Sequence, residues 1–393
     1  MSHEQAVPLV RRMSARDPAE PHRAATPLEL FFDLVFVVAI ASAAAQWHHG
    51  LSEGHVGDLV GFLMVFFAIW WAWMNYTWFA SSYDCDDVPY RLLTFTIMAG
   101  SLMLAAGIPG FFASGQSVLV VTGYAVMRVA MVAMWLRAAA GHPQGRATAL
   151  GYAVGIAVVQ VLWIGRLLVE GRAALIVSFL LLVVLELLVP VVAERRGITP
   201  FHPHHIAERY ALLTIIVLGE VILASVQAVQ GALDRGPELG LVALMVGALL
   251  LVLSMWWLYF TRDHAPLFNG GIRATFVTGY GHYLVFASVA GTGAALAAAV
   301  DLVQEEAHTS SRVVGLALAG AVAVYVWCVT AMHALAGSPV PERRVGVGVG
   351  VVVLAIAAAA PPIGVTVALV GLVLTAAVAQ HVRATHLAGR RAA

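Results

Sequence analysis

The feature that most constrains this chain is a series of apolar stretches that can each cross a lipid bilayer as a helix. A spanning helix needs about 20 mostly apolar residues. Twelve stretches approach or exceed this length: residues 28–47, 56–80, 90–113, 117–138, 147–167, 173–193, 206–228, 238–260, 276–300, 312–335, 345–360 and 363–382. They lack the polar–apolar alternation of barrel strands, and lipid offers unpaired backbone groups no partners. The sequence therefore predicts an all-α, polytopic transmembrane bundle of about twelve spans.

The composition supports a chain that lies in lipid. Of the 393 residues, 61% are hydrophobic and 11% are charged, whereas soluble domains carry about 25% charged residues. The bilayer is therefore the first expected partner, and a net charge of zero gives no basis for a nucleic-acid partner. The two cysteines, Cys85 and Cys328, lie too far apart for a disulfide framework or a zinc-binding spacing. All 22 basic residues are arginines, which is typical of GC-rich bacterial genes.

The distribution of arginines predicts the topology. If the N-terminus is cytoplasmic, 17 arginines fall on the cytoplasmic side and 4 on the outer side, as the positive-inside rule requires. We expect a multi-pass protein of the bacterial cell membrane with both termini in the cytoplasm. Residues 1–25 are polar and contain several prolines, which predicts a disordered cytoplasmic tail rather than a cleaved signal peptide. Residues 383–393 form the expected cytoplasmic C-terminal tail.

The two halves of the chain resemble each other loosely. The stretches 26–47 and 204–228 both carry acids, and a tryptophan-rich span follows each of them. An offset of six spans keeps the orientation, so the halves 26–193 and 194–382 are compatible with a parallel six-plus-six repeat, an arrangement that often frames a site near the midplane. The tryptophans at 70–78 and 256–257 are expected in an aromatic belt at the membrane interface.

Two acids open the first span. Thr26, Pro27 and Glu29 fit a capping box, which gives Glu29 a structural explanation. Asp33 lies one turn further in, on the same helix face as Glu29. Two carboxylates on one face can share a proton or hold a cation, so a proton- or substrate-binding role and a buried hydrogen bond to a neighbouring helix remain the alternatives.

The seventh span also carries ionisable groups at its start and, in addition, one near its middle. His205, Glu208 and Arg209 lie at its cytoplasmic end, and Glu220 lies near its middle. A carboxylate at that depth costs roughly 2.5 kcal/mol or more, so it should be protonated or paired with a cation. Arg209 and Glu220 face almost the same direction around the helix. All four are candidate substrate- or proton-binding residues.

Two further polar residues lie inside spans. Arg128 cannot readily lose its proton and needs an acid, a carbonyl cage or an anionic ligand; Glu220, Asp33 and Glu186 are the possible acids. His282 is isolated in an apolar helix, where a hydrogen-bonded core histidine is the main alternative to a binding role. The histidines at 202, 204 and 205 lack the spacing of a helical zinc site, and we expect neither a metal nor a cofactor.

The sequence shows no nucleophile elbow, no phosphate-binding glycine loop and no dinucleotide fingerprint. The stretch from Pro27 to Phe36 resembles the opening of the bacterial low temperature requirement A (LtrA) family. Similarity to recurring positions of that family continues at Asp86-Asp87, Arg91, His205, Glu208-Arg209 and Leu218-Gly219-Glu220. It covers most of residues 26 to 300. The resemblance implies an integral membrane protein named for a growth requirement in the cold, and it supplies no catalytic residues.

Three functions fit these observations. We favour a secondary transporter or proton-coupled permease of unknown substrate that uses its intramembrane acids. The alternatives are a membrane-embedded, lipid-handling enzyme and a structural or stress-related membrane protein without a substrate. Whether the protein is an enzyme depends on this choice, and the expected partner besides lipid is an unknown small molecule or ion.

Overall fold

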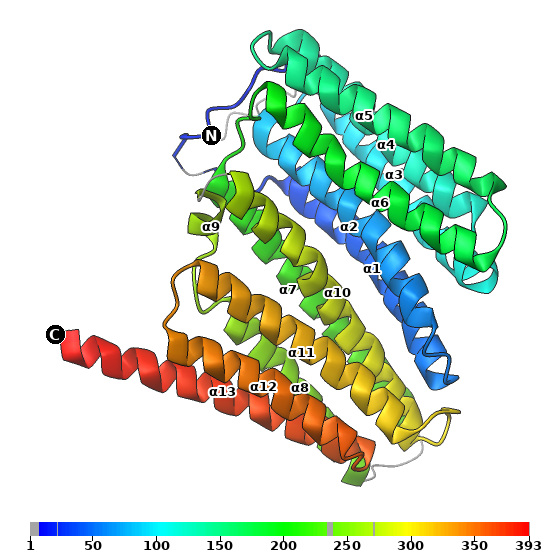
Figure 1. Ribbon diagram of the computed structural model, residues 1–393, viewed down its shortest axis with the longest axis vertical. Coiled ribbons are helices and arrows are strands. Elements are labelled where there is room, and N and C mark those ends of the chain that lie inside the picture. The colour runs from blue at the N-terminus through cyan, green and yellow to red at the C-terminus, as the bar shows by residue number, and fades with distance from the viewer. Residues whose placement is uncertain (1–7, 22, 234–238, 270–271, 393) are drawn as a thin grey trace, which may run out of the picture. The chain divides into compact units, whose positions relative to one another are not determined.

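The computed structural model describes residues 8–21, 23–233, 239–269 and 272–392, and this part of the chain contains helices and no strand (Figure 1). The α-helices are α1 (Pro27–Ser52), α2 (Asp58–Tyr83), α3 (Val88–Ser114), α4 (Val118–Gly141), α5 (Arg146–Gly165), α6 (Arg172–Ala193), α7 (Pro203–Leu233), α8 (Leu239–Tyr259), α9 (Ala265–Asn269), α10 (Ile272–Val303), α11 (Ser311–Leu335), α12 (Val340–Ala358) and α13 (Ile363–Ala392). Two 3₁₀ turns, Arg166–Leu168 and Glu194–Arg196, extend α5 and α6.

The predicted helical membrane bundle is confirmed. Within the described residues, eleven helices are long and apolar enough to cross a membrane. The twelfth long helix, α12, has 19 residues and begins with charged residues, Glu342 to Arg344, so only its later part is apolar. The short helix α9 was not among the predicted segments, since five residues are too few to show a helical pattern.

Local sequence signals set several helix boundaries. Asp87 caps α3 because its side chain accepts a hydrogen bond from the backbone N–H of Tyr90, and Pro89 follows in the first turn. Gly115 ends the same helix with a φ of 75°, a left-handed conformation that glycine adopts without steric cost. Ser117 and Ser310 cap α4 and α11 in the same way as Asp87.

The chain divides into two compact units. Unit 1 comprises Met1–Ala43 and Met64–Arg209, and unit 2 comprises Ala44–Leu63 and Tyr210–Ala393. Helices α1, α2 and α7 therefore each contribute one part to unit 1 and another part to unit 2.

In unit 1, helices α3 to α6 lie side by side (Figure 1). One side of α6 carries apolar side chains that are about half exposed, among them Leu180, Leu181 and Val184. Apolar area of this extent is unfavourable in water and favourable in lipid. This side of α6 is therefore a lipid-facing surface.

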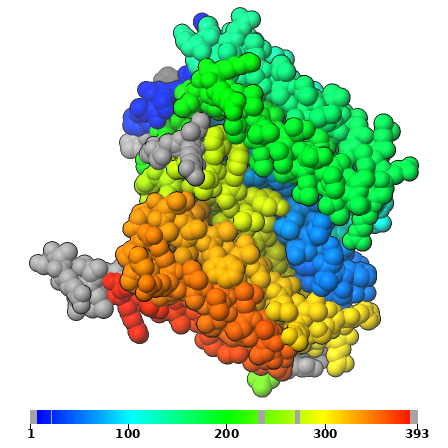
Figure 2. Space-filling model, viewed as in Figure 1, coloured from blue at the N-terminus to red at the C-terminus, as the bar shows by residue number. Residues whose placement is uncertain are grey.

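In unit 2, α10 is the most buried of the candidate spans. Helices α8 and α13 approach closely, since a side chain at Gly371 would collide with the carbonyl oxygen of Gly247. Small residues at such crossings let helix backbones pack tightly in a membrane. In the view of Figure 2, the side chains of α11, α12 and α13, coloured orange to red, form one surface of this unit.

The described part of the N-terminal segment, residues 8–21 and 23–25, makes contacts with distant parts of unit 1. Arg12 donates from Nε to the carbonyl oxygen of Gly141 at 2.8 Å, and the backbone N–H of Arg11 donates to Asp87. Met13 is 2% exposed and lies so close to Gly141 that any side chain there would collide with it. These long-range partners fix a segment whose polar, proline-rich sequence predicts disorder.

Candidate functional site

The candidate site in unit 1 begins at the first turn of α1. The predicted capping box is present: Glu29 Oε2 accepts from the backbone N–H and the hydroxyl of Thr26, and Thr26 accepts from the N–H of Glu29. Only one oxygen of Glu29 takes part in this cap. The other, Oε1, faces the first turns of α7, so the capping and binding explanations of Glu29 are compatible.

Arg209 of α7 lies between the two acids of α1. Its Nη2 donates to Asp33 Oδ1 at 2.5 Å, and its Nη1 lies 3.1 Å from Glu29 Oε1. The spacing of four residues between Glu29 and Asp33 places both carboxylates on one helix face, where one guanidinium can reach both. A planar guanidinium with several donors suits this arrangement better than an ammonium group.

Two more side chains complete this cluster, and a third, Arg23, lies at its edge. Trp73 of α2 donates its indole N–H to Asp33 Oδ1 at 2.7 Å. His205, one turn before Arg209, places Nε2 3.1 Å from Glu29 Oε1, and Arg23 lies 3.7 Å from the same oxygen. We call Glu29, Asp33, Trp73, His205 and Arg209 the acid–arginine cluster.

The acid–arginine cluster is closed to both water and lipid. Glu29 is 1% exposed, and Asp33, His205 and Arg209 are 0% exposed. One oxygen of Asp33, Oδ2, has no hydrogen-bond partner among the described residues. A buried carboxylate oxygen without a donor is costly, and a bound proton would lower that cost. Asp33 Oδ2 is therefore the atom of the cluster best placed to take up a proton.

The edge of the cluster reaches a more polar region. Asp84, directly after α2, lies 3.6 Å from Arg23 and 3.8 Å from Arg16. Burial and the nearby charge of Glu29 raise the pKa of Asp84 to about 6, although the two arginines oppose this rise. The predicted site residue Glu208 directly precedes Arg209 in sequence, but its hydrogen-bond partner lies outside the cluster. Its Oε2 accepts the backbone N–H of Ala25, which fixes the position of the chain just before α1.

Arg128 belongs to a second buried network in unit 1. Of the three acids considered as partners, the structure pairs it with Glu186, at 2.7 Å between Nη2 and Oε2. Tyr124 receives a hydrogen bond from Arg128 and donates to Glu186, which also accepts the indole N–H groups of Trp71 and Trp163. Five buried groups thus form one network that includes this ion pair, in which the carboxylate of Glu186 accepts a hydrogen bond from each of the other four, whereas Nε and Nη1 of Arg128 have no hydrogen-bond partner among the described residues.

The tryptophan belt expected at residues 70–78 is wrong for Trp71 and Trp73. Both are at most 1% exposed, and both donate to buried carboxylates. An indole N–H inside an apolar span needs an acceptor, and this need was the sequence signal that could have linked these residues to the acids. Trp256 and Trp257, by contrast, are 45% and 49% exposed, as the belt requires.

The remaining candidates, Glu220 and His282, lie in unit 2. Glu220 is half-buried, and its side chain has neither a hydrogen bond nor an ion pair with the described residues. His282 is fully buried; its Nε2 lies 2.9 Å from the hydroxyl of Tyr259, and its Nδ1 lies 2.7 Å from the carbonyl oxygen of Thr278. The contacts of His282 are those of a hydrogen-bonded core histidine.

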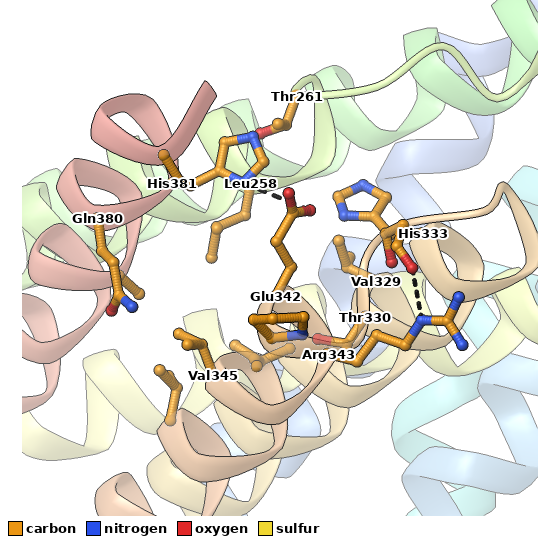
Figure 3. Close-up of a pocket in the computed structure, with 17 residues that line it drawn as sticks. Leu258, Thr261, Val329, Thr330, His333, Glu342, Arg343, Val345, Gln380 and His381 are labelled. Atoms are coloured by element: carbon orange, nitrogen blue, oxygen red, sulfur yellow. Dashed lines mark hydrogen bonds and ion pairs between the residues drawn. The ribbon is translucent and has the colours of Figure 1, made fainter. Parts of the chain in front are cut away.

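Unit 2 also contains a small cavity of about 140 Å³ between α8, α11, α12 and α13. Figure 3 shows His333, Glu342 and His381 grouped at its polar side. Glu342 lies 2.9 Å from Arg262 and 3.9 Å from His381. Valines and Leu258 line much of the rest, so the cavity combines one polar side with an apolar side.

Within the described residues, no group of three histidine, cysteine or acidic side chains could hold a metal ion. His202, directly before α7, has other partners: its Nε2 lies 3.0 Å from the carbonyl oxygen of Glu20, and its Nδ1 accepts the backbone N–H of His205. His202 thus helps to begin α7, which positions His205 and Arg209 toward α1.

Comparison with known proteins gives the family. The chain is 31% identical over 240 residues to Uncharacterized protein RA0937 of Rhizobium meliloti (strain 1021), a match that covers 59% of this chain and 57% of that protein. The chain thus spans a little over half the length of the curated relative it matches, and no solved structure matches it. Residues 24–379 match the family described as bacterial low temperature requirement A protein (LtrA). The chain is an integral membrane protein that belongs to the bacterial low temperature requirement A family.

Proposed function

We propose that the protein is a secondary transporter that couples the movement of a small solute or ion to proton movement. The observation that carries the proposal is that one buried guanidinium, Arg209, is shared by two buried carboxylates, Glu29 and Asp33. Ionisable groups in a membrane-spanning segment are costly and are typical of ion and proton pathways. The acid–arginine cluster has the chemistry of a proton-binding centre.

The proposed coupling follows from the charges. With both acids ionised, Arg209 balances only one of them, and Arg23 balances the other from 3.7 Å. A proton on Asp33 would remove one attraction that holds α1 to α7. Interactions between charges are strong at low dielectric, so one proton would change the relative stability of two conformations. Such a differential effect is what allows a bound proton to drive a conformational change.

The lipid-handling alternative requires an opening near Glu29 and His205 that could admit a headgroup. Since these residues are 1% and 0% exposed, this conformation offers no surface for one. The structural alternative predicts that the cluster never opens to water. Alternating access of the cluster therefore separates the transporter from the structural role, and it can be tested without knowing the substrate.

The test uses cysteine accessibility in α1. In a background with Cys85→Ser and Cys328→Ser, Ile40→Cys places a thiol two turns beyond Asp33, at a site that is 3% exposed. A charged, membrane-impermeant thiol reagent should modify it from one side of a proteoliposome at low pH and from the other side at high pH. Asp33→Asn in the same background should abolish this pH dependence.

Val38→Cys is the matched control, because Val38 lies on the same helix and is 48% exposed on an apolar surface. A charged reagent should not reach a thiol that faces lipid at either pH. If Ile40→Cys reacts from neither side at any pH, the cluster stays closed and the structural role is correct. Reaction from one side alone, independent of pH, would also contradict proton-coupled transport.

A further inference from the structure

Unit 2 contains a long apolar groove, separate from the acid–arginine cluster. It has a volume of about 540 Å³ and is formed by the end of α1, the beginning of α2, α10 and α11. Its lining is almost wholly apolar and includes Trp47, Leu59, Leu284 and Val324. In Figure 2 the blue surface around the α1–α2 turn, which belongs to unit 2, borders the yellow surface of the α10–α11 region.

The length of the groove matches the thickness of the hydrocarbon layer in one leaflet of a bilayer. Its lining on α11 runs from Val313 to Val324, which corresponds to about 16 Å at 1.5 Å per residue. Half of the hydrocarbon core measures about 15 Å. Two glycines, Gly291 and Gly320, contribute no side chain, and a Cβ placed at Gly320 would meet no atom within 4 Å. The groove thus has the length and shape for one extended hydrocarbon chain.

Charged groups of both signs lie close in sequence to lining residues at one end of the groove, which we take as its mouth. Arg312 immediately precedes the lining residue Val313, is exposed, and has no ion pair or hydrogen bond with the described residues. Glu53 lies in the turn between α1 and α2, between the lining residues Leu51 and Val56, and its carboxylate is 3.4 Å from His308. The turn and the start of α11 are joined by a hydrogen bond of 2.7 Å from the N–H of His308 to the carbonyl oxygen of Ser52.

We propose that this groove binds one acyl chain of a phospholipid whose headgroup carries both a phosphate and a primary ammonium. The phosphate would pair with Arg312, since a guanidinium donates to phosphate through several N–H groups. The ammonium would pair with Glu53, whose ion-pair partner, His308, is charged only when protonated. A headgroup with negative charge alone would meet Glu53 unfavourably, so the mouth selects for a zwitterionic lipid.

The test measures lipid retained by the full-length protein in native mass spectrometry. Detergent-solubilised protein is incubated with dioleoyl phosphatidylethanolamine or with dioleoyl phosphatidylglycerol. We expect one phosphatidylethanolamine per chain to survive activation, with phosphatidylglycerol retained about tenfold less. Arg312→Gln should lower phosphatidylethanolamine binding about tenfold, the loss that one charge-assisted hydrogen bond implies. Glu53→Gln should bring the two lipids to equal retention.

A matched pair of substitutions tests the groove itself. Gly320→Leu fills the groove without a clash, and Gly348→Leu adds the same side chain to α12, where a Cβ also meets no atom within 4 Å and which does not line the groove. Gly320→Leu should abolish retention, whereas Gly348→Leu should retain lipid as the unaltered protein does. Equal retention by both variants, stronger binding of phosphatidylglycerol, or no effect of Arg312→Gln would each overturn the proposal.

Discussion

The Nη2 atom of Arg209 lies 2.5 Å from the Oδ1 atom of Asp33, although the two residues are 176 positions apart in the chain. Both side chains are 0% exposed, so water cannot replace either partner. The contact joins the second turn of α1 to the start of α7 and makes the charge of each residue tolerable in an apolar environment. The effects of substitutions at the two residues on the stability of the protein should therefore be coupled.

Arg209→Gln should be strongly destabilising because it leaves Glu29 and Asp33 facing each other without their shared cation. Removing one partner of a buried ion pair costs about 3–5 kcal/mol. The double variant Arg209→Gln, Asp33→Asn should recover part of that loss, since one uncompensated charge is also removed. Unfolding of the detergent-solubilised protein, followed by circular dichroism, measures both. Simple addition of the two single losses would show that the residues are not coupled.

The Arg128–Glu186 pair should behave differently from the acid–arginine cluster. The carboxylate of Glu186 accepts hydrogen bonds from Tyr124, Trp71 and Trp163 besides that from Arg128, so the pair resembles a structural one. Tyr124→Phe should lower the stability by about 1–2 kcal/mol, the cost of hydrogen bonds lost beside charged groups. The pH-dependent reactivity of Ile40→Cys should not change in this variant. A loss of that pH dependence would mean that the second network also takes part in the transition.

The sequence predicts the helices and part of the site because these depend on local patterns. Apolar runs predict the spans, and the spacing of four residues predicts that Glu29 and Asp33 share a face. It could not assign Arg209 to both acids or choose Glu186 for Arg128, because these pairings join helices that are distant in the chain. Arg23 was missed because it precedes α1 in a segment predicted to be disordered, and only the folded arrangement places it beside Glu29.

Asp84 should make the protein less stable as the pH rises. Its pKa is about 6 in the folded state because burial and the charge of Glu29 disfavour ionisation. The folded state therefore binds this proton more tightly than the unfolded chain, where an aspartate titrates near 3.9. The stabilisation is fully present below the unfolded pKa and is lost as the pH rises through about 6.

Asp84→Asn removes this titration. The variant should gain stability relative to the unaltered protein, by up to about 3 kcal/mol, when the pH rises from about 4 to about 7. Asp86→Asn is the control, since Asp86 is an exposed neighbour that pairs with Arg91 at the surface. The unfolding midpoints of the three proteins, compared at the two pH values, show whether Asp84 takes up a proton in the folded state. A constant difference between Asp84→Asn and the unaltered protein would contradict the assignment.

His264 should give unit 2 the opposite pH dependence. It lies between α8 and α9, 6% exposed, with its ring 4.6 Å from that of Tyr259 and about 6 Å from those of His282 and His333. Burial lowers its pKa to about 4, although Asp263 opposes this. Because the folded pKa is depressed, the stabilisation is present above the unfolded value near 6.5 and is lost as the pH falls through about 4.

His264→Gln, which keeps a polar group but cannot become charged in this range, should resist acid better than the unaltered protein by up to about 3 kcal/mol at pH 4. His308→Gln, at an exposed histidine of the same unit, should show no such protection. Hydrogen exchange of unit 2 peptides, compared between about pH 4 and about pH 7, measures the effect on this unit directly. Identical acid sensitivity of the His264→Gln and His308→Gln variants would contradict the role given to His264.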